Sequence, residues 1–246
     1  MSDADRLARE RDFHDDAFAT GARRNTARYY ETVRRSYTHY RETALAGAGR
    51  RAVVEYGCGT GSLAFTFAET GDTVTGIDIS PVAIEMATAE AQRRQLSGIS
   101  FEVMNAERLE FADSSLDLIC GSAVLHHLDL DRAGTEIRRV LKAGGRLVLF
   151  EPLGHNPLIN WYRRRTPYLR TVDEHPLRLD DVERFAKGFT SVDLRFFHIT
   201  SLGAAALVGR PGFSAALNTA EVLDGLLLRI PPLRRLAWIV VLTLGT

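Results

Sequence analysis

The feature that most constrains this chain is a regular alternation of short apolar runs and helical stretches between residues 51 and 152. Five runs are predicted to be strands: "RAVVEYG", "TVTGIDI", "ISFEVMNA", "SLDLICG" and "GGRLVLFEP". Helices are predicted between them over residues 60–69, 80–96 and 131–141, the second opened by Ser80 as N-cap and Pro81 in its first turn. Because parallel strands need helix-length connections, this order predicts an α/β fold with a doubly wound, mostly parallel sheet.

Composition excludes several classes of function and location. Lys+Arg and Asp+Glu both total 31, so no net charge or basic stripe attracts nucleic acid. The only cysteines, Cys58 and Cys120, lack metal-ligand or CxxC spacing, which is typical of a reduced compartment. The N-terminus has no signal-peptide pattern, and each apolar run is shorter than the roughly 20 residues that a membrane-spanning helix needs. We therefore expect a cytoplasmic protein without a transmembrane segment.

A glycine-rich turn, "GCGTG", follows the first predicted strand. Gly57, Gly59 and Gly61 allow a sharp turn and a close approach of backbone amides to a ligand. The helix that follows would direct its first N–H groups at a carboxylate or phosphate. The turn is thus predicted to hold an anionic group, although glycines can also serve only the packing of a tight β-to-α turn.

Asp78 ends the second predicted strand, 21 residues after Gly57. A carboxylate at this position can accept hydrogen bonds from both hydroxyls of a ribose. Ser80 is expected to cap the next helix and to leave Asp78 free, while the alternative for Asp78 is an exposed acid at a strand end. The glycine order differs from the GxGxxG of dinucleotide-binding enzymes, and this disfavours a nicotinamide cofactor.

Five segments in order, "VVEYGCGTG", "VTGIDIS", "NAERLEF", "LDLICGSAVLHHL" and "LKAGGRLVLFEP", resemble the successive motifs of class I S-adenosylmethionine-dependent methyltransferases of the small-molecule type. The resemblance implies a Rossmann-like sheet of seven strands, with the last strand, "AWIVVLTL", inserted antiparallel between the fifth and the sixth. It implies S-adenosyl-L-methionine as the cofactor. The residues that it assigns to cofactor binding are Glu55, Gly57, Cys58, Gly59, Gly61, Asp78, Ile79, Asn105, Ala106 and Gly121.

The resemblance also gives these residues separate roles. The glycine turn and Glu55 would hold the methionine part of the cofactor, and Asp78 would bind its ribose. Asn105 stands where the family commonly has Asp; its side-chain oxygen can still accept a hydrogen bond from the adenine amino group, while the amide of Ala106 donates to the ring. Gly121 would line the methyl-donor side.

We expect one domain over residues 1–246. It comprises a helical lid (1–48), the cofactor-binding core (49–152), substrate-side insertions and a cap (153–234) and the closing strand (235–246). In the lid, Tyr29 and Tyr30 would cover the cofactor, although Tyr30, Tyr37 and Tyr40 are also spaced as a packing face of one helix.

Methyl transfer from a sulfonium mainly requires alignment of the acceptor, and a hydroxyl or protonated amine also needs a base. The candidates are His126 and His127 after the fourth strand, and Glu151 and His155 at and after the end of the fifth. His126 and His127 can instead be scaffolding, and His155 can be loop packing. Glu151 can be an ion-pair partner of an arginine in "RRR", residues 163–165. His175 is a weaker candidate, and no metal site is predicted.

The apolar segment 202–233 is predicted to form a helical cap over the acceptor site. This favours methyl transfer to a hydrophobic small molecule or lipid-like acceptor, in specialised metabolism. The same face can instead be a homo-oligomer contact, as can the N-terminal helices. Two alternatives for the function stay open: a protein that binds S-adenosylmethionine for a rearrangement or for regulation, and, less favoured, an NAD(P)-dependent oxidoreductase.

Overall fold

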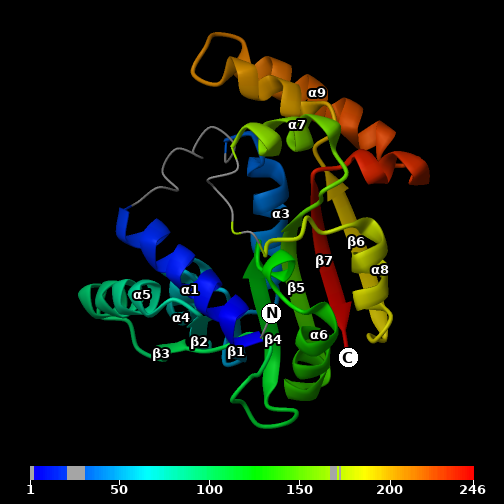
Figure 1. Cartoon of the computed structure of the whole chain (residues 1–246). Helices are drawn as coiled ribbons and strands as arrows, with labels where there is room; N and C mark the ends of the chain where they lie inside the picture. The colour runs from blue at the N-terminus through cyan, green and yellow to red at the C-terminus, as the bar shows by residue number, and fades with distance from the viewer. Residues whose placement is uncertain (1–2, 21–30, 167–170, 172) are drawn as a thin grey trace.

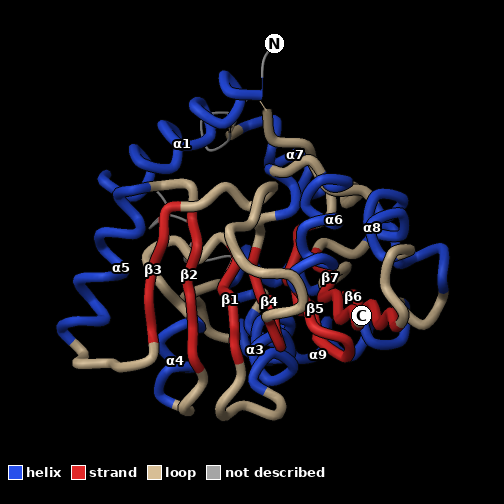
Figure 2. Tube along the Cα trace, turned by 90° about the horizontal axis from the view of Figure 1, so that it is seen from below, coloured by secondary structure: helices blue, strands red, loops and turns tan. Residues whose placement is uncertain are grey.

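The computed structural model describes residues 3–20, 31–166, 171 and 173–246. A seven-stranded sheet crosses the molecule in the order β3-β2-β1-β4-β5-β7-β6 (Figures 1 and 2). The strands are β1 (Ala52–Tyr56), β2 (Thr73–Asp78), β3 (Ile99–Val103), β4 (Leu116–Ser122), β5 (Leu141–Pro152), β6 (Ser191–Phe197) and β7 (Ile239–Gly245). β1 to β5 pair in parallel. The predicted α/β fold is therefore confirmed.

The last strand lies inside the sheet rather than at its edge. β7 pairs antiparallel with β5 on one side and with β6 on the other. This is the position predicted for the closing strand, and Ile239, Val240 and Leu242 are buried there. Its side chains enter an apolar core on each face of the sheet, Val240 and Leu242 on one and Ile239 and Val241 on the other, which explains its nearly continuous apolar sequence.

The helices of the described residues are α1 (Asp3–Thr20), α3 (Arg34–Leu45), α4 (Leu63–Glu69), α5 (Pro81–Arg93), α6 (Leu130–Val140), α7 (Pro157–Arg165), α8 (Leu179–Ala186) and α9 (Phe213–Leu227). Short 3₁₀ helices form η2 (Leu125–His127), η4 (Ser201–Leu207) and η5 (Pro231–Leu236). Ser80 accepts a hydrogen bond from the Ala83 amide, as predicted for the N-cap of α5.

Helices cover both faces of the sheet (Figure 2), and an apolar core lies on each face. In β1, Val54 and Tyr56 point to the core formed with α6 and α8, and Val53 points to the core formed with α3 and α4. Tyr37 and Tyr40 of α3 pack on Phe150, with ring centroids 5.8 and 6.0 Å away. Their tyrosine spacing thus serves packing, whereas Tyr29 and Tyr30 lie outside the described residues.

Two helix predictions need correction. α4 begins at Leu63 rather than at Thr60, because the glycine turn continues through Gly61 with a φ of +82°. Residues 157–165, predicted only as a polar insertion, form α7, whose N-cap Asn156 accepts from the amides of Leu158 and Ile159.

Candidate functional site

A cavity of about 100 Å³ lies at the carboxyl ends of β1, β2 and β4. This is the edge at which open α/β sheets bind ligands. Of the residues predicted to bind cofactor, six line the cavity: Gly57, Gly59, Asp78, Ile79, Asn105 and Ala106. His127 lines it from the turn after β4, and α1 covers it with side chains that include Glu10, His14 and Phe18.

The turn after β1 needs glycine for a steric reason as well as for its backbone angles. Gly57 has a φ of +68°, and a Cβ atom there would lie 2.9 Å from a methyl group of Val124. The turn is held to β2 by the Cys58 amide, which donates to the Ile77 carbonyl over 2.9 Å. The backbone of the turn can therefore approach both the β4 loop and a bound group.

Glu55 does not reach the cavity. Its buried carboxylate accepts hydrogen bonds from the amides of Ser62, Leu63 and Ala64, at 3.3, 3.1 and 2.9 Å, and from the Ser62 hydroxyl. Burial raises the pKa of Glu55, although these hydrogen bonds oppose the shift. These contacts give Glu55 a structural role at the start of α4, and its predicted contact with the methionine part of a cofactor, directly or through water, stays a prediction.

Asp78 lines the cavity. The sequence suggested that its carboxylate is free, but the structure gives it two hydrogen-bond partners. Its Oδ2 accepts from the Gly59 amide at 2.8 Å, and its Oδ1 accepts from the Ser80 amide at 3.0 Å. These bonds join the glycine turn to the start of α5. Since a carboxylate has about four lone-pair sites, it can still accept two further hydrogen bonds from a ligand.

The turn that contains Asn105 and Ala106 is held from two sides. The Asn105 side-chain oxygen accepts from the Glu107 amide at 2.9 Å. The Tyr56 hydroxyl donates to the Ala106 carbonyl. Tyr56 was not predicted as part of the site, and its position at the end of β1 is the signal that could have indicated it.

Three other residues predicted to bind cofactor lie behind the cavity wall: Cys58, Gly61 and Gly121. Gly121 allows β4 to approach β1, because a Cβ atom there would lie 2.6 Å from the Tyr56 carbonyl oxygen. The Cys58 thiol is buried, and this burial raises its pKa. Gly121 and Cys58 thus serve packing, and the predicted contact of these three residues with a cofactor stays a prediction.

Glu151 is fully buried at the end of β5, and its partners are not the predicted ones. Its Oε1 accepts from the amides of Val124 and Leu125 at 2.9 and 3.0 Å, and its Oε2 lies 3.3 Å from His126 Nδ1. Arg163 pairs with Glu174 instead, at 2.7 Å. Glu151 thus shapes the turn that carries His126 and His127.

The histidines predicted to be catalytic do not lie at one site. Only His127 among them lines the cavity, and its ring lies 4.2 Å from that of His126. His155 Nε2 accepts from the Leu179 amide at 3.0 Å and therefore holds the start of α8; burial lowers its pKa. The His175 amide donates to the His126 carbonyl.

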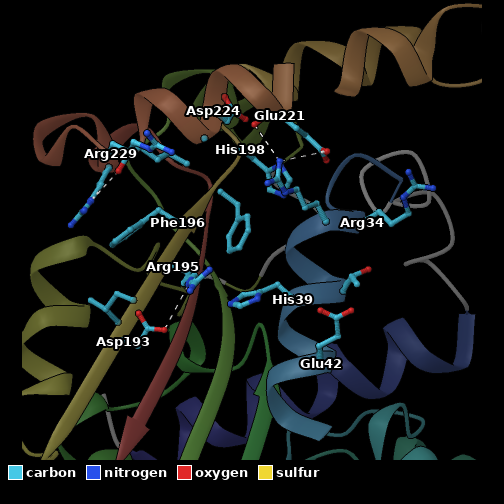
Figure 3. Close-up of a pocket in the computed structure, with 17 residues that line it drawn as sticks. Arg34, His39, Glu42, Asp193, Arg195, Phe196, His198, Glu221, Asp224 and Arg229 are labelled. Carbon is cyan, nitrogen blue, oxygen red and sulfur yellow. Dashed lines mark hydrogen bonds and ion pairs between the residues drawn. The ribbon is translucent and has the colours of Figure 1, made fainter. Parts of the chain in front are cut away.

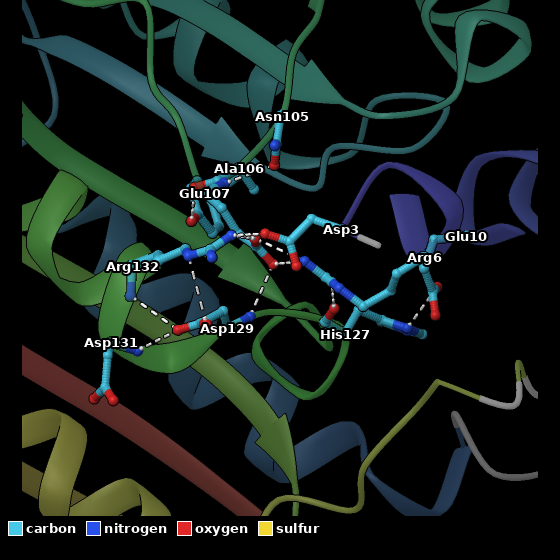
Figure 4. A network of polar contacts seen from close by, with 11 residues as sticks. Asp3, Arg6, Glu10, Asn105, Ala106, Glu107, His127, Asp129, Asp131 and Arg132 are labelled. Atoms are coloured by element: carbon cyan, nitrogen blue, oxygen red, sulfur yellow. Dashed lines mark hydrogen bonds and ion pairs between the residues drawn. The ribbon is translucent and has the colours of Figure 1, made fainter. Parts of the chain in front are cut away.

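Helix α1 is fixed over the cavity by charged contacts (Figure 4). Arg6 donates to both carboxylate oxygens of Glu107, at 2.6 and 2.7 Å, and to the His127 carbonyl at 3.1 Å. Glu10 Oε2 lies 3.0 Å from His127 Nδ1. Burial raises the pKa of Glu10, but the contacts with His127, His14 and Thr171 outweigh burial, so the pKa of Glu10 is lowered. Sequence reasoning missed these residues, although Glu10, His14 and Phe18 recur every four residues on one helix face.

A second, larger cavity of about 740 Å³ lies between α3, β6 and α9 (Figure 3). Charged side chains dominate its wall, among them Arg34, Arg195 and Glu221. Residues 202–233 contribute to this cavity, and none of them lines the cavity at the strand ends; the predicted cap over the acceptor site stays a prediction. The apolar side chains of Val222 and Leu226 on α9 are exposed.

Among the described residues, no helix combines the length and the apolar composition needed to cross a membrane. This finding agrees with the short apolar runs of the sequence.

Comparisons with known proteins show a likeness to methyltransferases. Residues 54–149 match the family described as "Methyltransferase domain". The uncharacterized methyltransferase YcgJ of Bacillus subtilis is 32% identical over 141 residues, which cover 57% of this chain and 52% of that protein. The demethylmenaquinone methyltransferase of Tropheryma whipplei is 38% identical over 117 residues, which cover 46% and 48% of the two chains. The chain thus spans about half the length of these curated relatives.

One solved structure extends the likeness in fold. Phosphoethanolamine N-methyltransferase 2 of Haemonchus contortus, in complex with phosphomonomethylethanolamine and S-adenosylhomocysteine, has a TM-score of 0.68 and 18% sequence identity. The match covers 96% of this chain and 59% of that one. Residues 54–149 thus match a methyltransferase domain, and the likeness to the solved structure is one of fold.

Proposed function

We propose that this protein binds S-adenosyl-L-methionine in the cavity at the strand ends and transfers its methyl group to a small-molecule acceptor. The observation that carries the proposal is the shared cavity of the Gly57 and Gly59 turn, Asp78 and Asn105. Backbone amides of the turn suit the carboxylate of the cofactor, the Asp78 carboxylate suits its ribose hydroxyls, and Asn105 with Ala106 suits adenine.

Cofactor binding requires α1 to move. The cavity measures about 100 Å³, whereas pockets for ligands of this size span roughly 300–1,000 Å³. Phe18 and Leu7 of α1 occupy part of the cavity wall, so a displacement of this helix would enlarge the site. We infer that α1 is the lid over the cofactor.

His127 is the residue that we retain in contact with the reacting groups, because it lines the cavity. His126 and Glu151 act as positioning residues through the turn between β4 and α6. His155 is left out, since its Nε2 lone pair is used by the Leu179 amide. Alignment of the acceptor supplies most of the rate enhancement for a donor that is already activated.

The acceptor is proposed to be hydrophobic, and the setting to be specialised metabolism in the cytoplasm. Leu7, Met104 and Leu128 make part of the cavity wall apolar, which supports such an acceptor. The exposed apolar face of α9 supports the further proposal that the chain forms a homo-oligomer. A role in binding S-adenosylmethionine without methyl transfer is the alternative that turnover must exclude.

Calorimetric titration with S-adenosylmethionine, S-adenosylhomocysteine and NADH tests the donor. We expect the first two to bind the wild type, and Asp78→Asn to weaken them by about 10-fold or more, because bonds to a charged acceptor contribute roughly 1.5–3 kcal/mol each. Asp193→Asn, on β6 and in the other cavity, is the matched control. Binding of NADH alone would refute the proposal.

Turnover is tested separately with radiolabelled methyl donor and a panel of hydrophobic alcohols, phenols and amines. Label in a product that wild type forms and His127→Ala forms at least about 100-fold more slowly would support methyl transfer. Donor binding without transfer to any compound of the panel would favour the binding-only alternative.

A further inference from the structure

We propose that Glu10 and His14 of α1, together with His127 of the turn after β4, form a site for one divalent transition-metal ion. One ligand atom from each of the three residues lies within 4.8 Å of the other two. Glu10 and His14 are four residues apart on one face of α1, and His127 approaches from the other side of the cavity wall. The site goes beyond the proposed methyl transfer, which needs no metal.

The two separations from Glu10 Oε2 are close to the edges of a coordination shell. Glu10 Oε2 lies 3.0 Å from His127 Nδ1 and 3.6 Å from His14 Nε2. Ligands about 2.1 Å from an ion at tetrahedral or octahedral angles are separated by about 3.0–3.4 Å. Only small side-chain adjustments would therefore close the shell around an ion.

A second observation is that two of these atoms are buried and form no hydrogen bond. Glu10 Oε2 and His127 Nδ1 are both excluded from solvent, and neither has a hydrogen-bond partner among the described residues, although they are close to each other. Glu10 as a whole is only 3% exposed. Buried polar atoms in such a state are costly, and a shared cation would satisfy both lone pairs.

The remaining polar atoms near the site already have partners that orient it. Glu10 Oε1 accepts from the Thr171 hydroxyl, which turns Oε2 toward the histidines. The His127 carbonyl accepts from Arg6, which fixes the backbone that carries the ring. Contacts of this kind are typical of the outer shell that holds metal ligands in place.

The ligand set indicates the class of metal. Two imidazoles and one carboxylate suit Zn²⁺ and similar transition metals better than Mg²⁺ or Ca²⁺, which prefer oxygen ligands. Three protein ligands would leave at least one coordination position for water or an acceptor oxygen. When bound, such an ion would hold α1 to the turn after β4, and His127 would then act as a ligand rather than as a base.

A neighbouring group, His126, His127 and Glu174, also brings three ligand atoms together. Its carboxylate, however, is paired with Arg163 at 2.7 Å, and His126 Nδ1 faces Glu151 Oε2. A cation there would compete with an arginine for Glu174. Charge compensation thus favours the group centred on Glu10.

The test uses the full chain, freed of metal by a chelator and then titrated with Co²⁺ and Zn²⁺. We expect one equivalent of Co²⁺ with visible d–d absorption, displaced by Zn²⁺. His14→Ala and Glu10→Gln should weaken binding by more than the roughly 10–100-fold that loss of an outer-shell partner costs. His39→Ala, in the cavity beside α3, is the control and should bind like the wild type.

A thermal melt with and without Zn²⁺ separates loss of the site from loss of the fold. Zn²⁺ should raise the melting temperature of wild type and of His39→Ala but not of a folded His14→Ala. The proposal is overturned if wild type binds no ion, or if Glu174→Gln abolishes binding while His14→Ala does not. Titration of the same samples with S-adenosylhomocysteine distinguishes this failure from failure of the proposed function.

Discussion

His198, which follows β6, is a buried residue whose protonation state is set by its neighbours. Ser36 Oγ donates to the Val33 carbonyl at 2.8 Å, so it accepts from His198 Nε2, also 2.8 Å away. His198 Nδ1 then accepts from the Ser201 hydroxyl at 2.9 Å. The neutral imidazole thus joins α3 to η4.

Burial lowers the pKa of His198 to about 4, from an unfolded value of about 6.5. Between these pH values the unfolded chain binds a proton at His198 that the folded chain does not bind. The stabilisation that neutral His198 gives the folded chain is therefore fully present above about pH 6.5 and is lost as the pH falls toward 4. The free energy of unfolding should fall by about 3 kcal/mol across this window because of His198.

Urea unfolding of wild type and His198→Gln at several pH values between 7 and 4 measures this contribution. The amide of Gln can replace both hydrogen bonds but does not titrate in this range, so the variant should lose less stability on acidification. Equal loss in both proteins would assign the acid sensitivity to other groups.

Among the elements, α1 is the one that we propose to control access to the cavity. Arg6 attaches α1 to the cavity wall through Glu107. The Arg6 side chain is 20% exposed, and the Glu107 side chain is 3% exposed. A pair this well buried is screened less than a surface pair, and its loss leaves the Glu107 carboxylate with only the more distant Arg132, at 3.9 Å, as a cationic neighbour among the described residues.

We predict that Arg6→Gln opens α1 more often and speeds association of S-adenosylhomocysteine by about fivefold or more, since one charged hydrogen bond contributes roughly 1.5–3 kcal/mol. Stopped-flow fluorescence measures the association rate. Arg11→Gln is the matched control on the same helix, because Arg11 is 48% exposed and only 3.5 Å from Asp12. Unchanged rates in Arg6→Gln would mean that α1 does not limit entry.

At the scale of the whole molecule, the last strand completes both cores and joins two parts of the sheet. β7 pairs along its length with β5 and with β6, and it buries Ile239, Val240, Val241, Leu242 and Leu244. Burial of each such side chain contributes about 1.5–3 kcal/mol, so the five together equal the whole stability of an ordinary domain, about 5–15 kcal/mol.

Removal of residues 239–246 should therefore prevent folding rather than merely weaken it. Circular dichroism and the soluble fraction on expression measure the outcome. Deletion of Thr246 alone is the control; it removes the hydrogen bonds to Gly145 and Lys142 but no apolar contact. A soluble, cooperatively unfolding truncation would show that the β1–β5 unit folds without its last strand.

The sequence by itself determined the order of strands and helices and the cavity edge. Apolar alternation in β1 assigns Val53 and Val54 to opposite faces, and helix-length gaps require parallel pairing. Gly57, Gly59, Asp78 and Asn105 meet at one edge because they follow the ends of parallel strands. These are local properties, so a single sequence suffices to predict them.

Only the tertiary structure decided which side chains face that edge and which are used elsewhere. Glu55 is on the face of β1 toward α4 and is taken up by the start of that helix. Glu10 and His14, more than 100 residues before His127, meet it only because α1 folds back over the cavity. Periodicity specifies the face of an element but not the partner of that face, since the partner depends on contacts between segments that are distant in the chain.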